Sequence, residues 1–219
     1  MLRERLEQVE ERIANAAARA GRARSEITLI AVTKKFPADV IREAYDLGMR
    51  RFGENYVQEF EGKHPALADL ADAEFHLIGH VQSNKARPAA ELFQVIQTVD
   101  SERLARRVDQ FGRPIEVMIE VKLSEEQAKA GAAPESLDAL IGAIRECANL
   151  NLTGLMTMPP WSDDPEQTRP YFRRLAELGR RHALPKLSMG MSHDLEAAIE
   201  EGATHIRIGT ALFGPRRKE

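Results

Sequence analysis

The stretch that decides the fold is Ile27-Thr-Leu-Ile-Ala-Val-Thr-Lys34. It is short, mostly apolar and rich in β-branched residues, and Pro37 follows soon after it, which is typical of a buried strand. A charged residue at the C-terminal end of such a strand is where an α/β barrel places its chemistry. A lysine there can lose its proton on desolvation and form a Schiff base. Position alone leaves open that Lys34 is a surface lysine just beyond a strand.

The strand pattern recurs along the chain and alternates with helical patterns. Strands are expected at 27–33, 50–53, 74–78, 94–99, 114–122, 151–158, 186–188 and 205–208. Strict alternation favours a parallel sheet, and about eight units favour a closed barrel over an open sheet. Residues 2–20 show apolar positions at helical spacing before the first strand. We therefore predict an α/β fold: one (β/α)8 TIM barrel domain over residues 1–219, with an extra N-terminal helix.

Local signals place the helices between these strands. Residues 55–71 are expected to form one helix, and Ser83 and Ser101 are expected to cap the N-termini of two others. The segments 44–53 and 198–209 repeat one pattern: a helix, a glycine stop, a short strand and a final glycine. This repeat is the sequence form of a recurring helix-to-strand unit.

Composition excludes several classes of protein. The formal net charge is -3 and aromatic residues make up 5% of the chain, which argues against a nucleic-acid-binding protein. The single cysteine, Cys147, cannot form an intramolecular disulfide and fits a reducing compartment. No apolar segment is long enough to span a membrane, and the N-terminus does not resemble a signal peptide. We therefore expect a cytoplasmic protein.

Two segments near the C-terminus carry glycine and hydroxyl groups after expected strands. They are Ser188-Met-Gly-Met-Ser192 and Arg207-Ile-Gly-Thr-Ala-Leu-Phe-Gly214. Backbone N–H groups at such turns suit a phosphate, and barrels often bind phosphate after their seventh and eighth strands. Each segment alone is accounted for by a helix cap and a tight turn, but together they predict a phosphate-binding cup. His76 and His80 would lie roughly 13 Å apart in extended chain, too far for one metal ion, and we predict no metal site.

Six segments together resemble one known family. They are Ala31-Val-Thr-Lys34, Phe52-Gly-Glu-Asn-Tyr-Val-Gln-Glu59, His76-Leu-Ile-Gly-His-Val-Gln-Ser-Asn-Lys85, Gly154-Leu-Met-Thr-Met158 and the two C-terminal segments above. In order and over nearly the whole chain, they are similar to the pyridoxal phosphate homeostasis proteins, relatives of the alanine racemase barrel. The resemblance implies a barrel that binds pyridoxal 5′-phosphate (PLP) and acts in vitamin B6 homeostasis.

The resemblance also implies the roles of particular residues. Lys34 matches the lysine that carries PLP as a Schiff base, the N6-pyridoxal phosphate lysine, and Lys35 does not. The remaining cofactor-binding positions are Asn55 and Met156 in the pocket, Arg207 facing the pyridine nitrogen, and Ser192, Gly209 and Thr210 at the phosphate. His80, Gln82, Ser83 and Asn84 match a motif near the open side of the cofactor whose role is less settled. Phe75 and His193 stand where the family often has Trp and Asp.

The expected function is that of a PLP carrier or buffer without strong catalysis. Guanidinium cannot give up its proton, so Arg207 would leave the ring nitrogen unprotonated and PLP a poor electron sink. No residue can be assigned as a second acid or base opposite Lys34, and we assign no catalytic residue. Two alternatives stay open: a weak PLP-dependent amino-acid racemase and a phosphosugar-binding barrel enzyme. Expected partners are PLP, PLP-dependent apoenzymes and free amino acids, with a monomeric chain.

Overall fold

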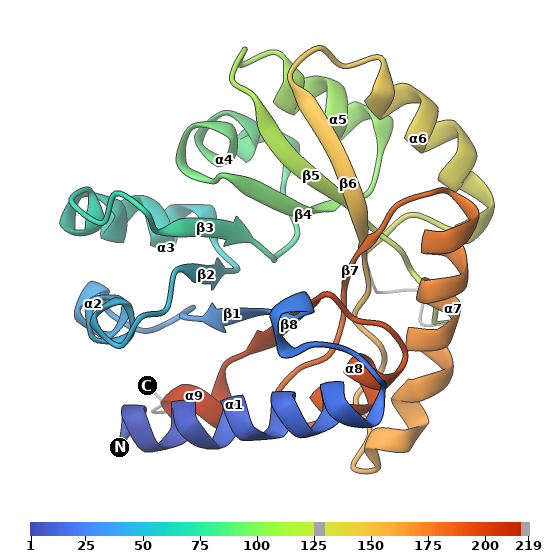
Figure 1. Ribbon diagram of the computed structural model, residues 1–219. Coiled ribbons are helices and arrows are strands. Elements are labelled where there is room, and N and C mark those ends of the chain that lie inside the picture. Colours follow the sequence, from blue (N-terminus) through green and yellow to red (C-terminus); the bar gives the residue numbers. More distant parts are fainter. Residues whose placement is uncertain (125–129, 216–219) are drawn as a thin grey trace.

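The computed structural model describes residues 1–124 and 130–215, and within them eight parallel strands close into a barrel (Figure 1). The strands are β1 Thr28–Val32, β2 Arg51–Glu54, β3 Glu74–Leu77, β4 Val95–Val99, β5 Ile115–Glu120, β6 Leu150–Met156, β7 Lys186–Ser188 and β8 His205–Ile208. They are hydrogen-bonded in sequence order, and β8 returns to pair with β1. The predicted barrel is confirmed.

The helices surround the barrel. They are α1 Leu2–Arg19, α2 Ala38–Asp46, α3 Val57–Lys63, α4 Ala86–Leu92, α5 Glu102–Asp109, α6 Leu137–Arg145, α7 Arg169–Arg181, α8 Leu195–Glu200 and α9 Thr210–Phe213. Short 3-10 helices lie at η1 Arg24–Glu26, η2 His64–Leu67, η3 Ser83–Lys85, η4 Pro134–Ser136 and η5 Pro165–Thr168. The main core forms where the apolar faces of the helices meet the strands.

Two helix boundaries differ from the sequence-based expectation. The helix expected over 55–71 is divided into α3 and η2, since Pro65 at the start of η2 has no N–H to continue the α-helical hydrogen bonds. Ser83 is the first residue of η3 rather than a cap. Ser101 does cap α5, because its hydroxyl accepts from the backbone N–H of Leu104 at 3.4 Å. The glycine stops are confirmed: Gly48 and Gly202 both have positive φ, 95° and 101°.

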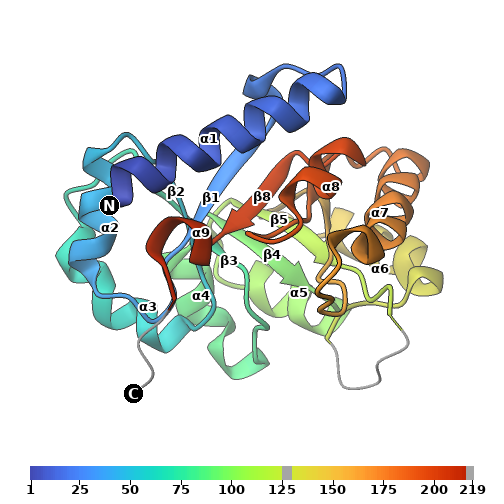
Figure 2. The same ribbon diagram turned by 90° about the horizontal axis from the view of Figure 1, so that it is seen from below.

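The extra helix α1 packs along the outside of the barrel against α8 and α9 (Figure 2). Its buried residues are Leu2, Val9, Ile13, Ala16 and Ala17. Arg12 extends from the same helix to Glu196 at 2.6 Å and to the backbone carbonyl of Ser192 at 3.1 Å. The extra helix therefore holds the chain that follows β7.

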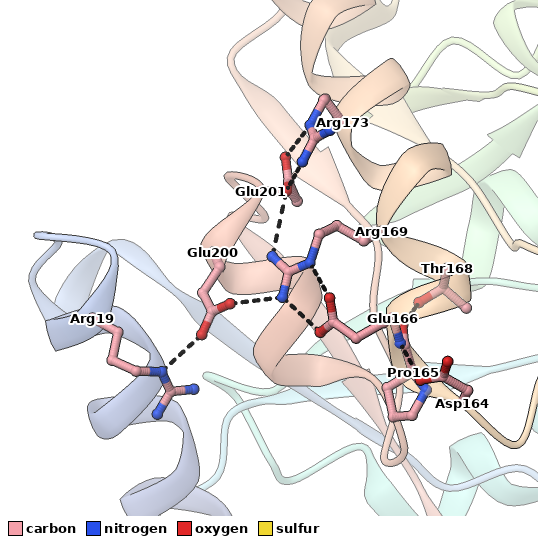
Figure 3. Close-up of polar contacts among 9 residues, drawn as sticks. All are labelled: Arg19, Asp164, Pro165, Glu166, Thr168, Arg169, Arg173, Glu200 and Glu201. Carbon is pink, nitrogen blue, oxygen red and sulfur yellow. Dashed lines mark hydrogen bonds and ion pairs between the residues drawn. The ribbon is translucent and has the colours of Figure 1, made fainter.

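An ion-pair cluster joins α1, α7 and α8 (Figure 3). Its members are Arg19, Glu166, Arg169, Arg173, Glu200 and Glu201. Arg169 is central and bonds Glu166 at 2.7 Å, Glu200 at 2.9 Å and Glu201 at 3.3 Å. The hydrogen bond to Glu166 is the main cause of the rise in the pKa of Arg169. The cluster fixes the beginning of α7 relative to the end of α8.

Gly154 is required where β6 passes β7. A Cβ built on Gly154 would overlap the backbone carbonyl of its register partner Lys186. In contrast, Gly142 lies on the exposed side of α6 with nothing within 4 Å of a Cβ. The two glycines are therefore a matched pair, one inside the barrel wall and one on its surface.

We expect Gly154→Ala to lower the free energy of unfolding by about 1–3 kcal/mol or more, because the strands must separate to admit the methyl group. Gly142→Ala should be neutral or stabilise by up to about 1 kcal/mol, because alanine has the higher helix propensity. Denaturant unfolding of both variants checks this. Equal stability of the Gly154→Ala variant and the wild type would contradict the close approach of β6 and β7.

Candidate functional site

A pocket of about 530 Å³ lies at the C-terminal ends of the strands. Six of the seven predicted cofactor-binding residues line it: Lys34, Asn55, Ser192, Arg207, Gly209 and Thr210. Apolar side chains complete the wall, among them Val32, Ile78 and Met158. Met156 is not among the lining residues; it is fully buried on β6, two residues before Met158. The chain thus gathers into one pocket residues that lie almost 180 positions apart.

Lys34 is presented by a tight turn that follows β1. The N–H of Phe36 donates to the carbonyl of Thr33 at 3.1 Å, so Lys34 and Lys35 are the two central residues of the turn. Lys35 has φ of 65°, in the left-handed region, and its N–H donates to Glu59 at 2.5 Å. The turn gives the two lysines different surroundings, and Lys34 is the one that lines the pocket.

A buried ion pair holds this turn against β2. Glu54, with no exposed surface, accepts from the hydroxyl of Thr33 at 2.7 Å and from Lys63 Nζ at 3.1 Å. Lys63 Nζ also donates to the Thr33 carbonyl at 3.1 Å and pairs with Glu59 at 2.5 Å. Burial raises the pKa of Glu54, while the nearby Lys63 cation opposes that rise. Lys63 therefore compensates the buried carboxylate and fixes the residue that precedes Lys34.

Arg207 is buried where β8 ends, with 3% of its surface exposed. Its guanidinium donates to the Ser188 hydroxyl at 2.7 Å and to the Thr157 carbonyl at 2.9 Å. The Ser188 hydroxyl in turn donates to Gln97 at 2.6 Å. Burial lowers the pKa of Arg207 to about 10, so the group stays charged at neutral pH. Since guanidinium has five N–H donors, these two bonds leave donors for a ligand atom in the pocket.

The residues of the predicted phosphate cup lie in the loops after β7 and β8 and line the pocket. The N–H of Ala211 donates to the Ser192 hydroxyl at 3.1 Å, which joins the two loops. The nearest atoms to a Cβ built on Gly209 lie on Val32, at 3.5 and 3.6 Å, which is ordinary contact. The protein's own packing therefore does not require glycine at 209. The missing side chain leaves backbone open to the pocket, as close approach by an anion needs.

Asn55 is fixed by the glycine that ends the next strand. A Cβ on Gly79 would overlap the backbone carbonyl of Asn55, so this contact requires glycine. The side-chain Oδ1 of Asn55 is buried and has no hydrogen-bond partner within the described residues. Because buried polar atoms are normally satisfied, the Asn55 amide marks a place for a polar ligand group.

The motif at residues 80–84 is not brought together at this pocket. His80 is half-exposed, lies 3.4 Å from Asp100 and lines a neighbouring pocket. Ser83 and Asn84 line a separate surface cleft with three arginines of α5, Arg103, Arg106 and Arg107. The described residues contain no group of three or more side chains suited to bind a metal ion, and no helix long and apolar enough to cross a membrane.

Sequence reasoning missed several residues in and around the site. Glu54 and Gln97 bond to residues next to it, Glu120 lines the neighbouring pocket, and Trp161, the single tryptophan, lines both pockets. Three of these residues lie within strands: Glu54, Gln97 and Glu120. The alternation of polar and apolar residues along a strand does not tell whether a polar side chain points into the barrel or outward. Trp161 lies in the loop after β6, 70% exposed, with its ring 5.0 Å from that of His193. The Pro159-Pro160 pair, which follows β6, was the available signal for this loop.

Comparison with known proteins agrees with this geometry. Residues 5–217 match the family described as alanine racemase, N-terminal domain. The pyridoxal phosphate homeostasis protein of Aquifex aeolicus is 46% identical, covering 98% of each chain. That of Pseudomonas aeruginosa is 47% identical, covering 97% of this chain and 95% of its own.

This chain belongs to the pyridoxal phosphate homeostasis protein family. Among solved structures, PipY of Synechococcus elongatus with PLP bound superposes with a TM-score of 0.83 at 40% identity, covering 98% of this chain and 100% of PipY. Alanine racemase of Bacillus anthracis, at 15% identity and a TM-score of 0.69, shares the fold of the barrel.

The residues in the pocket fit PLP. The unpartnered Oδ1 of Asn55 and the open backbone at Gly209 are two features that the protein's own contacts leave unexplained. A cation with N–H donors to spare, Arg207, and a lysine, Lys34, line the same pocket. PLP carries a phosphate, a phenolic oxygen, a ring nitrogen and an aldehyde, one polar group for each of these features.

The Glu54–Lys63 pair yields a stability prediction. Lys63→Met keeps most of the side-chain stem but leaves Glu54 as a buried charge without its cation, which should cost about 3–5 kcal/mol of unfolding free energy. The double variant Glu54→Gln/Lys63→Met should regain much of that loss, since no charge is then buried. Arg87→Met, which breaks an exposed pair with Glu91, is the control and should leave the free energy of unfolding nearly unchanged, because solvent screens the pair. Denaturant unfolding measures all three, and a loss below about 1 kcal/mol for Lys63→Met would show that the pair does not hold the turn.

Proposed function

We propose that this protein binds PLP covalently through Lys34 and acts in vitamin B6 homeostasis as a carrier or buffer of the aldehyde. The observation that carries the proposal is the position of Lys34 in one pocket with Asn55, Arg207 and the loop at Gly209-Thr210. The likeness to PipY, which has been solved with PLP bound, supports it over nearly the whole chain.

Each lining residue has a separate task in this proposal. When bound, PLP supplies an aldehyde that condenses with primary amines and a pyridine ring that can withdraw electrons. Lys34 Nζ is the amine that holds the aldehyde carbon. Ser192, Gly209 and Thr210 bind the phosphate with hydroxyl and backbone N–H groups, and the Asn55 amide binds the polar edge of the ring. Met156 supports the pocket from beneath, next to Glu120 and Ser188 in strand register.

Arg207 makes the carrier role preferable to the weak racemase alternative. Its guanidinium keeps its proton at neutral pH, since burial lowers the pKa only to about 10. It therefore donates to the ring nitrogen and does not protonate it, which limits the electron withdrawal that breaking a Cα–H bond requires. A site of this kind binds the cofactor while restraining its chemistry.

The wider setting belongs to the same proposal. Residues 1–219 act as one PLP-binding domain, and the chain works as a monomer. We place it in the cytoplasm, where its one cysteine, Cys147, buried and unbridged, would stay reduced. PLP-dependent apoenzymes and free amino acids receive the aldehyde from it. Reversible bonding to Lys34 suits such a role, because the same reaction loads and unloads the carrier.

The first test of the proposal is covalent labelling of Lys34. Purified protein incubated with PLP should absorb in the visible range, and borohydride reduction should leave a pyridoxyl group on the peptide that contains Lys34. Lys34→Arg should lose both signals, because guanidinium remains protonated and cannot condense with an aldehyde. The matched variant Lys35→Arg should retain them. A label on Lys35, or visible absorbance that survives Lys34→Arg, would refute the assignment.

The phosphate cup is tested by comparing PLP with pyridoxal. Charge-assisted hydrogen bonds contribute about 1.5–3 kcal/mol each, so pyridoxal should bind at least about 10-fold more weakly. Gly209→Val should remove most of that preference by filling the cup, while the contact of Lys34 with the aldehyde remains. Equal affinities for the two aldehydes would rule out the cup. Binding of a phosphosugar with no binding of PLP would instead support the phosphosugar alternative.

A further inference from the structure

A second pocket, of about 560 Å³, adjoins the first at the mouth of the barrel. The two pockets share three lining residues, Met158, Trp161 and Met191, so they are direct neighbours. The volume is in the range usual for sites that hold small organic molecules. None of the predicted PLP-binding residues lines this second pocket.

Glu120 is the unexplained residue of this pocket. It is the last residue of β5, lines the pocket, and has only 3% of its surface exposed. Its Oε2 has no hydrogen-bond partner within the described residues. A buried acceptor left unpaired is destabilising, more so when the group is charged, so native proteins rarely keep one without a reason.

Among the described residues, no cation donates a hydrogen bond to this oxygen. Arg207 is close enough to favour the ionised form of Glu120, but its guanidinium donates to Ser188 and Thr157. His80 also favours the ionised form, while Asp100, which lies 3.4 Å from His80, opposes it. Burial is the main influence and raises the pKa of Glu120. A ligand that brings a positively charged N–H donor would both fill the missing bond and offset this burial.

The rest of the pocket narrows the class of ligand. Lys122 and His80 line it beside Glu120 and can bind a carboxylate. Leu123, Met158 and Trp161 add apolar surface suited to a hydrocarbon side chain. The carboxylate of Glu120, the cationic groups and the apolar wall match, in turn, the ammonium group, the carboxylate and the side chain of an apolar α-amino acid.

We propose that this second pocket binds an apolar α-amino acid, with its ammonium group on Glu120 and its carboxylate near Lys122 and His80. The amine is thereby stored beside the pocket that holds the aldehyde. The site would then serve as the entry point for the amines that remove the aldehyde from Lys34, a role that rests on the proposed function. Binding at Glu120 does not depend on it.

Trp161 makes the proposal measurable, because it is the only tryptophan of the chain and lines the pocket. The experiment is a tryptophan fluorescence titration of the full-length Lys34→Arg protein without PLP. L-Leucine should give a saturable change. 4-Methylpentanoate, which is leucine without its amine, should bind about 10- to 100-fold more weakly, as expected for loss of a charged hydrogen bond. 3-Methylbutylamine, which lacks the carboxylate, should also bind more weakly than leucine.

Variants of β5 assign the effect to Glu120. Glu120→Gln should weaken leucine binding about 10- to 100-fold and leave 4-methylpentanoate unchanged. Glu116→Gln, on the same strand but paired with Lys186 outside this pocket, is the matched control and should bind leucine as the parent protein does. Thermal unfolding of each variant verifies that it is folded.

The outcomes separate this inference from the proposed function. No response to leucine, equal binding of leucine and 4-methylpentanoate, or an unchanged affinity in Glu120→Gln would overturn the amino-acid site. Equal binding of leucine and 3-methylbutylamine would overturn the assignment to amino acids. Failure of the wild-type protein to bind PLP would refute the proposed function alone, because the titration uses a protein in which Lys34 is absent.

Discussion

Pairing between the first and last strands of the barrel is the constraint on which the site depends. Ala31 of β1 lies opposite Ile208 of β8, and Ile30 lies opposite Arg207. Lys34 follows β1 and Gly209 follows β8. Because the barrel closes by pairing these two strands, the two residues lie side by side although they are far apart in the sequence. An open sheet with the same strands would leave them on opposite edges. The barrel is therefore a requirement for this pocket rather than a neutral scaffold.

Three ionisable side chains, Glu54, Arg207 and Glu120, are buried near this pocket, and they differ in how far the protein compensates their charge. Glu54 is compensated by Lys63 and by the Thr33 hydroxyl. Arg207 is held by a hydroxyl and a carbonyl within the barrel. Glu120 alone among the three keeps an oxygen without a partner in the described chain. The first two are built for rigidity, since moving either would expose an uncompensated charge to apolar surroundings.

The barrel was predicted from local signals, while the six predicted residues that line the pocket came mainly from the resemblance to the family. Local pattern contributed the strand-end position of Lys34 and the two C-terminal loops. Apolar β-branched runs mark the strands, glycines such as Gly48 and Gly202 stop the helices, and a parallel barrel collects whatever follows each strand at one face. The interior network of Gln97 and Ser188 could not be predicted. Each is a buried polar side chain within a strand. Burying it is tolerated only because the two side chains hydrogen-bond to each other, and they lie 91 positions apart in the sequence. Met156 illustrates a related limit: it ends β6 fully buried, whereas Met158, two residues later in the following loop, lines the pocket.

A carrier of PLP must meet two opposing requirements, firm binding and ready release. It must hold a reactive aldehyde firmly enough to keep free PLP low, yet release it to other amines. In the proposed function, covalent bonding to Lys34 would hold the aldehyde, and the phosphate cup would select the phosphorylated form. Release needs a second amine close to the first, and a pocket that shares a wall with the PLP site would bring that amine close without displacing the phosphate. Trp161, Met158 and Met191 form that wall, and the flexible thioethers of the two methionines suit a boundary that must admit a neighbour of varying shape. On this view the barrel mouth serves the transfer of the aldehyde from Lys34 to another amine. Arg207 limits the reactions of the bound cofactor, and Glu120 binds the incoming amine.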